Sequence, residues 1–486
     1  MHISLKVGFG LKPDDKPLTL DEAINQLEIK VDQIGIAHSI QEKEISLWPD
    51  NFTFNLEQRV KSAREFRTEK EAIQKQKNIS GKHRRQLMKN LQKQKNIWHY
   101  DQLRFAHQAI HGSDPVKQRF MHFWWNHFTV GNTNGTNFYT GDLYWDVINK
   151  GISGTFSDLL YNVTKHPAML TYLDNVYSVG EKSQKGLDAS NNPSKKLHVG
   201  LNDNLARELL ELHTLSPKAN YTEKDIRNVA KILSGWGYIF NREKDWEWVS
   251  SLGVNDPSDA FISRHHEPGD KEVLGKIYAK GFFSSGKDSL RKLTDDLSLN
   301  PITIKHLSLK LCKHFINEKP TPEDVSHVEN AWINSAGDLK SIHKSVLEKA
   351  FQSADIEKFQ WPLTWVFSVL RTSGSDIFPG WKNIHSHPSF DRKGGRLYRE
   401  IGQNFWSRRQ PNGFSDEKND WVSSEHMDRR LRITNIVSSF GNPKVSSTNI
   451  LEKLQMSQAT RELVSLGLNE TEKFTLLCCS PEFMGG

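Results

Sequence analysis

Cysteine is scarce in this sequence: only Cys312, Cys478 and Cys479 occur among 486 residues. Three cysteines are too few for a disulfide framework, and no Cys-x-x-Cys pair is present, which argues against a cysteine-bound zinc ion or an iron–sulfur cluster. We therefore expect all three to be buried free thiols.

Long hydrophobic runs are also missing. No stretch of about eighteen consecutive apolar residues occurs, so we expect no membrane-spanning helix. The first residues, "MHISLKVGFGLKPDD", lack the charged-then-apolar pattern of a secretory signal. The protein is thus expected to be periplasmic or extracellular if a leader was removed, and cytoplasmic otherwise.

Several catalytic motifs are absent. The sequence has no Walker loop, no Gly-x-Gly-x-x-Gly before a helix, no Gly-x-Ser-x-Gly and no His-Glu-x-x-His. These absences disfavour phosphate-cradling NTPases, classical dehydrogenases, serine hydrolases and zincins. If a metal is bound, the available carboxylate, amide and imidazole ligands favour Mg²⁺, Ca²⁺, Mn²⁺ or Zn²⁺.

The net charge of +7 comes from one segment. Residues 69–96 hold nine Lys and Arg against two acids, and the rest of the chain is balanced at 56 against 56. We expect this segment to project from the body of the protein. It is either a solvated surface helix or insertion, or a segment that contacts an anionic polymer. It contains no aromatic residue on which bases could stack, so sequence-specific binding of nucleic acid is not supported.

Helical patterns dominate the rest of the sequence. Thr19 and Glu22 form a capping box, Thr222 caps a helix that Gly235 stops, and Thr321 precedes Pro322 at a first helical position. Residues 155–174 read as a helix interrupted at Pro167 and followed by a second, short one. The fold class is therefore predicted to be mainly α, a compact multi-helix globule with at most a small β-hairpin, for which residues 245–269 are the candidate.

The pattern also predicts a division of the chain. We expect an N-terminal helical segment of the core at 1–68, a basic projecting segment at 69–97 and a central helical core with the candidate site at 98–310. A C-terminal helical part, 311–486, would contain a long irregular loop at 373–421 that is rich in Gly, Pro and Trp.

The stretch "LNDNLARELLELHT", residues 201–214, carries a polar strip on an apolar helix. At about 100° per residue, Asn204, Arg207, Glu208 and Glu211 fall within roughly one quarter of the circumference. Two carboxylates one turn apart repel each other unless a cation or a shared proton lies between them. The strip is either a buried Arg–Glu network that holds helices together or the wall of a metal or acid–base site.

Three other stretches have the same character: "FMHFWWNHFTV", "KHPAMLTYLDN" and "RHHEPGDKEVLG". Their polar residues also fit a satisfied core histidine or a solvated turn. The candidate site combines these stretches with the strip, so that the predicted catalytic residues are Glu208, Glu211, His127, His266 and Arg207, and the predicted substrate-binding residues are Asn126, Asn204, His166, Asp174 and Lys271.

Six blocks in order, "FWWNHFTV", "HPAMLTYLDN", "LNDNLARELLELHT", "YTEKDIRNVAKILSGW", "HEPGDKEVLG" and "SPEF", carry a resemblance. With "VGFG" near the N-terminus, the chain resembles the large bacterial family catalogued as domain of unknown function 1800 over almost its whole length. The resemblance implies no catalytic residues. It does imply a sulfatase-like protein partner, because family members are often encoded beside one.

Both lines of reasoning lead to one expectation. A cluster of Asn, Arg, Glu and His in buried helices is costly without partners, and it suits acid–base chemistry or a hard cation. We expect an enzyme that hydrolyses or modifies an anionic polymer or glycan, with a divalent metal as a candidate cofactor. The alternative is a non-catalytic protein that binds or matures a neighbouring sulfatase-like enzyme, with a purely structural polar network.

Overall fold

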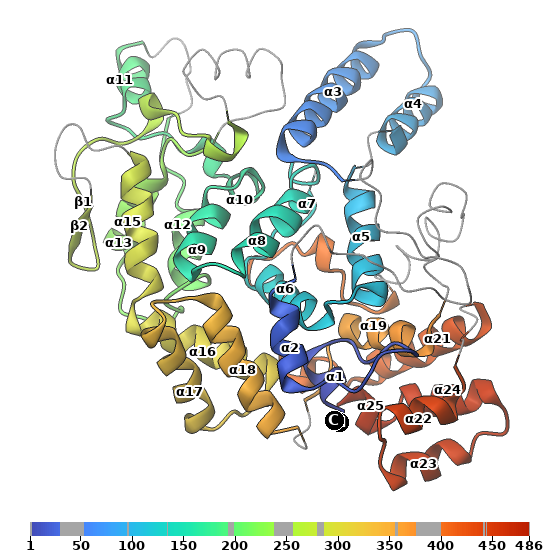
Figure 1. Cartoon of the computed structure of the whole chain (residues 1–486). Coiled ribbons are helices and arrows are strands. Elements are labelled where there is room, and N and C mark those ends of the chain that lie inside the picture. The colour runs from blue at the N-terminus through green and yellow to red at the C-terminus, as the bar shows by residue number, and fades with distance from the viewer. Residues whose placement is uncertain are drawn as a thin grey trace.

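The computed structural model describes residues 2–29, 53–94, 97–133, 135–192, 199–237, 256–278, 286–354, 358–375, 400–440, 443 and 445–485. Helices make up most of this part of the chain, and a two-stranded sheet is its only sheet (Figure 1). The prediction of a mainly α fold with at most a small β-hairpin is therefore confirmed. No helix among the described residues is both long and apolar enough to cross a membrane.

The helices of the first half of the chain are α1 (Ile3–Val7), α2 (Leu20–Leu27), α3 (Leu56–Lys75), α4 (Gly81–Gln94), α5 (Ile97–His111), α6 (Pro115–His127), α7 (Thr140–Asp142), the π-helical η3 (Leu143–Ile148), α8 (Asn149–Gly151), α9 (Phe156–Thr164), α10 (Pro167–Tyr172), α11 (Gln184–Asn191), α12 (Asn204–Glu211) and α13 (Glu223–Leu233). Those of the second half are α15 (Gly286–Ser298), α16 (Pro301–Phe315), α17 (Pro322–Asn334), α18 (Leu339–Gln352), α19 (Pro362–Ser373), α21 (Ser424–Phe440), α22 (Ser447–Lys453), α23 (Gln458–Ser465), α24 (Glu470–Cys478) and α25 (Pro481–Met484). The short 3₁₀ turns are η4 (Asn175–Tyr177), η6 (Pro257–Asp259), η7 (Ser263–His265), η10 (Phe405–Ser407) and η11 (Lys418–Asp420), and the strands are β1 (Lys271–Val273) and β2 (Lys276–Tyr278).

Local capping signals set the helix starts that the sequence predicted. Thr19, Thr222 and Thr321 each accept a hydrogen bond from the third helical backbone N–H, and the acidic residue at that position bonds back. Pro167 begins α10 and separates it from α9, because its ring fixes φ and its nitrogen carries no hydrogen. These predictions held because each depends on residues only three or four positions apart.

The β-hairpin lies just after the segment in which it was expected. The described part of that segment, residues 256–269, contains the 3₁₀ turns η6 and η7, and the strands pair at 271–278. Leu274 and Gly275 form the two-residue turn with φ of 50° and 76°, and a turn with both values positive matches the twist of paired strands. The Asp225 carboxylate accepts a hydrogen bond from the Leu274 backbone N–H and so helps to hold this conformation.

The helix α6 runs through the centre of the core (Figure 1). Every residue of α6 except Asn126 is buried, including Trp124 and Trp125. The hydrophobic core that surrounds it includes residues from both ends of the chain, from Leu5 to Met484. The thiols of Cys312 and Cys478 are buried, and Cys479 is half-buried; all three are free.

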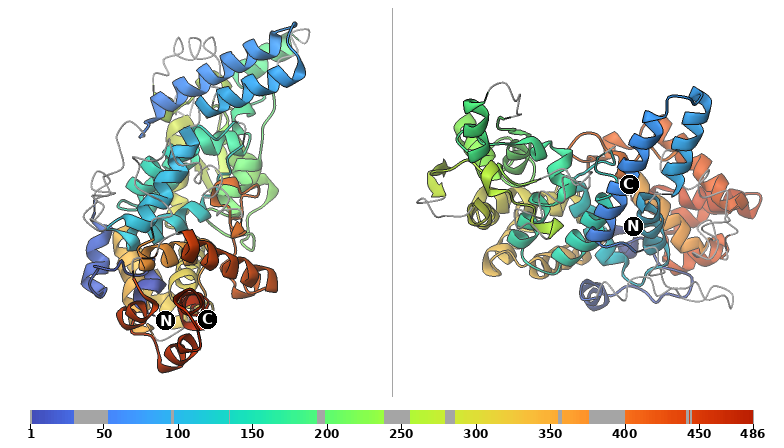
Figure 2. Two further views of the ribbon diagram at one scale, coloured as in Figure 1. Left: turned by 90° about the vertical axis from the view of Figure 1, so that its right-hand side faces the viewer. Right: turned by 90° about the horizontal axis from the view of Figure 1, so that it is seen from above.

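The antiparallel pair α3–α4 stands out from the body (Figures 1 and 2). Its base is fixed by Arg59, Val60 and Ala63, which are buried, and by Phe66, whose ring lies 5.5 Å from that of Phe138. The rest of the pair, which contains the basic segment, has few core contacts of its own. The division of the chain into four segments stays a prediction.

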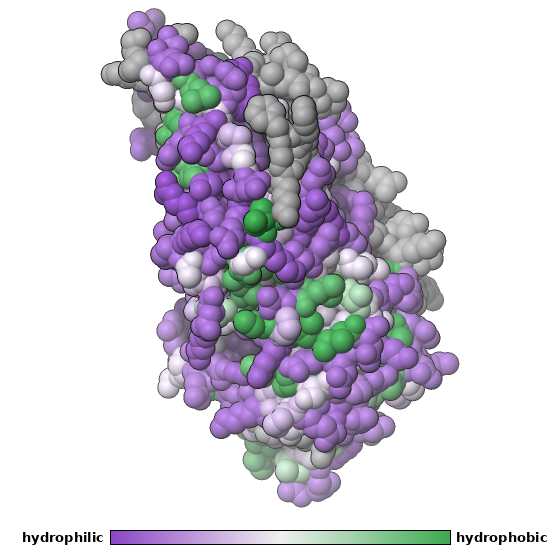
Figure 3. Space-filling model, turned by 90° about the vertical axis from the view of Figure 1, so that its left-hand side faces the viewer, coloured by the Kyte–Doolittle hydropathy of each residue, from purple (hydrophilic) through white to green (hydrophobic). Residues whose placement is uncertain are grey.

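A patch of hydrophobic residues interrupts the hydrophilic surface on the side of the molecule seen in Figure 3. Elements on this side, at the left of Figure 1, include β2 and α16, which carry the exposed Ile277, Ile302 and Leu309. Of the irregular loop predicted at 373–421, residues 376–399 lie outside the described part. Residues 401–421 contain only short 3₁₀ turns, in keeping with the prediction.

Candidate active-site cleft

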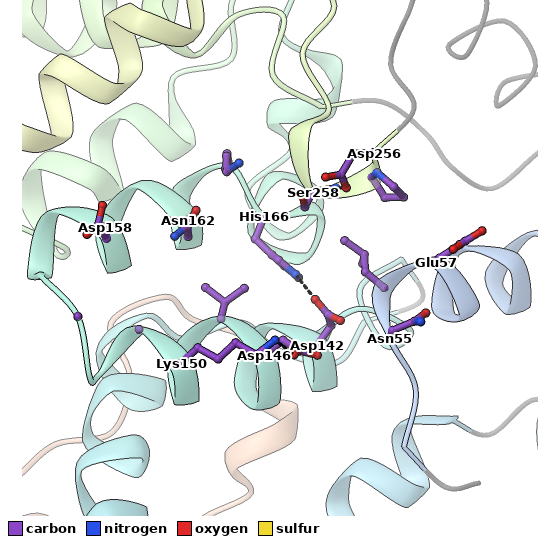
Figure 4. Close-up of a pocket in the computed structure, with 16 residues that line it drawn as sticks. Asn55, Glu57, Asp142, Asp146, Lys150, Asp158, Asn162, His166, Asp256 and Ser258 are labelled. Carbon is purple, nitrogen blue, oxygen red and sulfur yellow. Dashed lines mark hydrogen bonds and ion pairs between the residues drawn. The ribbon is translucent and has the colours of Figure 1, made fainter. Parts of the chain in front are cut away.

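A cleft of about 770 Å³ opens at the foot of α3. Its walls are the first turn of α3, the continuous helix formed by α7, η3 and α8, the outer face of α9, and η6 (Figure 4). The carboxylates of Glu57, Asp142, Asp146, Asp158 and Asp256 outnumber its two lysines, Lys150 and Lys165. The cleft is therefore acidic, in contrast to the basic outer part of the α3–α4 pair.

The helix from Thr140 to Gly151 supplies one wall. Asp142, Asp146 and Lys150 follow one another at intervals of four residues and face the cleft (Figure 4). The central turn of this helix, η3, has π-helical hydrogen bonding, which is rare and is frequently found at functional sites. On the opposite side of η3, Tyr144 and Ile148 are fully buried, so the helix is held firmly in the core.

Asp142 and His166 form the central pair of the cleft. His166 is the N-cap of α10, and its Nδ1 accepts a hydrogen bond of 3.1 Å from the Ala168 backbone N–H. The ring proton must therefore be on Nε2, which donates a 3.0 Å hydrogen bond to Oδ2 of Asp142 (Figure 4). Both side chains are almost fully buried, so their relative orientation is fixed.

Arg59 supports this pair from behind. Its two terminal nitrogens bind both carboxylate oxygens of Asp101, at 2.8 and 2.7 Å, and its Nε lies 4.0 Å from Oδ1 of Asp142. Burial opposes the charge of Arg59, but Asp101 and Asp142 raise its pKa above the ordinary value. A Cβ on Gly141 would lie 2.0 Å from the Asp101 carboxylate, so only glycine allows this close approach.

Most charged groups of the remaining walls interact with other residues of the protein. Asp158 is paired with Arg291 at 2.7 Å, and Asp256 caps η6 by accepting a hydrogen bond from the Ser258 N–H. Burial lowers the pKa of Lys165, whose ammonium lies 5.0 Å from the centre of the Tyr161 ring. Asp142 is thus the buried carboxylate of the cleft, and its Oδ1 keeps only the long contact with Arg59.

Of the ten site residues predicted from the sequence, His166 is the one that lines this cleft. The strip on α12 lies elsewhere, and it is partly exposed. Arg207 binds Glu211 at 3.3 Å and Glu223 of α13 at 3.0 Å, while Asn204 and Asp203 are exposed. Burial and the neighbouring Glu211 raise the pKa of Glu208.

His127 and Asn126 bind other parts of the fold. Nε2 of His127 donates to the His213 carbonyl at 3.2 Å, and Nδ1 accepts from the Lys310 ammonium at 3.0 Å. The Asn126 amide forms two hydrogen bonds with the backbone of Phe414, at 3.0 and 2.7 Å. Because both ring nitrogens of His127 are engaged, neither contacts the α12 carboxylates.

His266 and Lys271 form a similar pair. Nδ1 of His266 donates to the Ser234 carbonyl at 2.7 Å, and Nε2 accepts from the buried Lys271 ammonium at 3.1 Å. Lys271 also donates a hydrogen bond to the Glu267 carbonyl, so hydrogen bonds within residues 266–271 stabilise this turn. Asp174 is exposed, with φ of 58°. The structure thus keeps these residues in separate places, and their predicted roles stay predictions.

The sequence did not single out Asp142, Asp146 or Lys150. Their spacing in "TGDLYWDVINK" was a usable signal, because three charged residues at intervals of four within an aromatic segment mark one helix face. Among the described residues, no three His, Cys, Asp or Glu side chains are grouped so that they could hold a metal ion. A divalent metal cofactor stays a prediction.

Comparison with protein families gives one match. The family model described as "Protein of unknown function (DUF1800)" matches residues 2–485. The chain belongs to the DUF1800 family. No curated protein and no solved structure matched the sequence. The resemblance seen in the sequence blocks is therefore confirmed, and the match of the DUF1800 model includes every wall of the cleft.

Proposed function

We propose that the chain is an enzyme that binds a glycan in the cleft and hydrolyses or modifies it with Asp142 as general base. The observation that supports this most is the Asp142–His166 pair on the wall of an open cleft. The His166 proton holds Oδ2 of Asp142, so the carboxylate has one orientation, as acid–base catalysis requires.

The composition of the cleft favours a substrate rich in hydroxyl groups. Carboxylates and the amides of Asn55 and Asn162 accept hydrogen bonds from hydroxyls, and the amides also donate. The excess of carboxylates would repel a phosphate, sulfate or uronate group inside the cleft. We therefore assign the cleft to an uncharged or amino-bearing glycan and not to an anionic segment.

In a hydrolysis, Asp142 would take a proton from the water that attacks the sugar carbon, as one carboxylate does in inverting glycosidases. The bond from that carbon to the glycosidic oxygen would break, and the leaving oxygen would take its proton from solvent water in the open cleft. Arg59 and His166 hold the Asp142 carboxylate in place before the reaction. Asp146, one turn further along the same face and paired with Lys150, places a second negative charge where positive charge develops on the sugar.

A second candidate is a non-catalytic binding or maturation partner of another enzyme, such as a sulfatase-like protein. It is favoured by Asn126, His127, His266 and Lys271, which all bind neighbouring groups of the fold and do not line the cleft. Under this alternative, the cleft would bind a ligand without changing it.

The test is a screen of the purified protein against neutral, amino-bearing and acidic polysaccharides, with binding measured by calorimetry and cleavage measured as new reducing ends. Asp142→Asn should lower the rate by about a hundredfold or more while the protein still binds the glycan. The matched control is Asp188→Asn, which removes a half-buried carboxylate on α11 that is paired with Arg264 and does not line the cleft.

Three outcomes separate the candidates. Cleavage that Asp142→Asn abolishes and Asp188→Asn leaves intact supports the enzyme. Binding of a glycan without any change to it supports the non-catalytic partner. Cleavage that survives Asp142→Asn at the full rate would show that the chemistry takes place elsewhere.

A further inference from the structure

The projecting pair α3–α4 has a basic outer face on α4 that is not part of the cleft. α4 contains Lys82, Arg84, Arg85, Lys89 and Lys93 and no acidic residue. Among the described residues, Lys82, Arg85 and Lys89 have no ion-pair partner, and all three are exposed. A protruding surface with unpaired charges of one sign attracts ligands that carry the opposite charge.

The three cations form one row along α4. At about 100° per residue, Lys82, Arg85 and Lys89 fall within about 60° of the helix circumference and span about 10 Å of its length. The apolar Leu87 and Leu91 lie on the opposite face; Leu91 is buried, and α4 packs against α3. The row therefore points away from the rest of the protein.

Arg84 has a different task. It lies on the inner side of α4, and its Nη2 donates a 2.6 Å hydrogen bond to the carbonyl of Gln76, just after the end of α3. This bond joins the two helices across the turn. The basic row is consequently presented by a braced hairpin and is not carried on a loose tail.

We infer that the outer face of α4 binds an anionic polysaccharide through Lys82, Arg85 and Lys89. The charge complementarity of the row selects a linear polyanion, and two observations select the polymer class. Residues 69–94 contain no aromatic side chain on which nucleic-acid bases could stack. No large hydrophobic side chain of the described α3–α4 pair is exposed, so nothing there would insert into a lipid surface.

The position of the row gives this binding a consequence. The pair begins at the cleft, because Asn55, Leu56 and Glu57 line it, and α4 runs back along α3 toward the body (Figures 1 and 2). A polymer whose anionic stretch is held on α4 would therefore keep its uncharged stretches, which the acidic cleft can accept, near the mouth of the cleft. This delivery role rests on the proposed function, whereas the binding itself does not.

The test measures binding alone, with fluorescently labelled dextran sulfate and polygalacturonate as probes at about 50 mM salt, where screening is weak. The triple variant Lys82→Gln, Arg85→Gln, Lys89→Gln should bind both probes at least about tenfold more weakly than the unaltered protein, and binding should depend less on salt. Arg84 is left in place so that the hairpin turn is retained.

The matched control is the triple variant Lys292→Gln, Lys305→Gln, Lys344→Gln, which removes three exposed lysines from α15, α16 and α18. It changes the net charge by the same amount and should bind within about twofold of the unaltered protein, because distant exposed charges are screened. Thermal unfolding shows that both variants fold. The variant Lys82→Arg, Lys89→Arg keeps the charge and should keep the binding.

Equal weakening in the two triple variants would overturn the inference, since only net charge would then matter. So would the absence of binding to either probe at low salt. Tighter binding of a DNA oligomer, or of vesicles containing anionic lipid, that the α4 triple variant abolishes would show that the row serves another partner. None of these results depends on whether the cleft is catalytic.

Discussion

At the scale of single residues, burial decides what an ion pair does in this protein. Arg59 and Asp101 bind each other through two hydrogen bonds with only 2% and 4% of their side chains exposed. Arg207 and Glu211 make a single contact at 3.3 Å with 36% and 23% exposed. Water can solvate the second pair if it breaks, but it cannot reach the first.

We therefore predict losses of stability of very different size for two acid-to-amide changes. Asp101→Asn should lower the free energy of unfolding by about 3–5 kcal/mol, because it removes the carboxylate that binds both terminal nitrogens of the buried Arg59 and leaves only the 4.0 Å contact with Asp142. Glu211→Gln should change it by less than about 1 kcal/mol. Urea unfolding of both variants measures the difference, and losses of similar size would contradict this account of burial.

At the scale of elements, local features were predictable and distant pairings were not. The capping boxes at Thr19, Thr222 and Thr321 could be read directly, since all their parts lie within four residues. Asn126 was recognised as a polar residue in an aromatic helix, but its partner, Phe414, lies 288 residues away. No sequence pattern connects the two.

The candidate site shows the same limit. His166 was selected from its place at the edge of an apolar segment, and it does line the cleft. Its partner, Asp142, precedes a π-helical turn, and standard 3.6-residue periodicity does not predict such a turn. The polar strip on α12 shows the same limit, because Glu223, which pairs with Arg207, comes from the next helix, α13.

The link between α6 and residue 414 can be tested directly. Asn126→Ala removes both hydrogen bonds to the Phe414 backbone and should cost about 1–3 kcal/mol of stability, because the half-buried N–H and carbonyl lose their partners. The control Asn162→Ala alters an exposed amide on α9 and should stay within about 0.5 kcal/mol. Thermal unfolding of the two variants measures this difference. Equal stability of the two would show that Asn126 does not anchor the Phe414 segment.

At the scale of the whole molecule, several buried or half-buried histidines have a lowered pKa. Burial lowers the pKa of His213 and His343 to about 3 and that of His266 and His306 to about 4. Hydrogen bonds agree with this, since the His343 ring accepts one from the indole N–H of Trp124. A ring nitrogen that accepts a hydrogen bond cannot also carry a proton.

These histidines should make the protein sensitive to mild acid. An unfolded histidine takes up a proton near pH 6.5, whereas these four histidines take one up only at about pH 4 or below. Between these values the unfolded chain binds more protons, so each such histidine lowers the free energy of unfolding by up to about 1.4 kcal/mol per pH unit as the pH falls. The stability is fully present above pH 6.5 and is lost as the pH falls toward the folded-state pKa.

We predict that the urea midpoint falls steeply between about pH 7 and about pH 5, before the carboxylates of most proteins titrate. His343→Gln identifies the cause, because glutamine can accept the Trp124 hydrogen bond without titrating. This variant should be less stable at neutral pH from altered packing, yet its free energy of unfolding should depend less on pH by up to about 1.4 kcal/mol per unit in this range. If the midpoint stays constant between these pH values, the histidines have the same pKa in the folded and the unfolded protein, and the prediction is wrong.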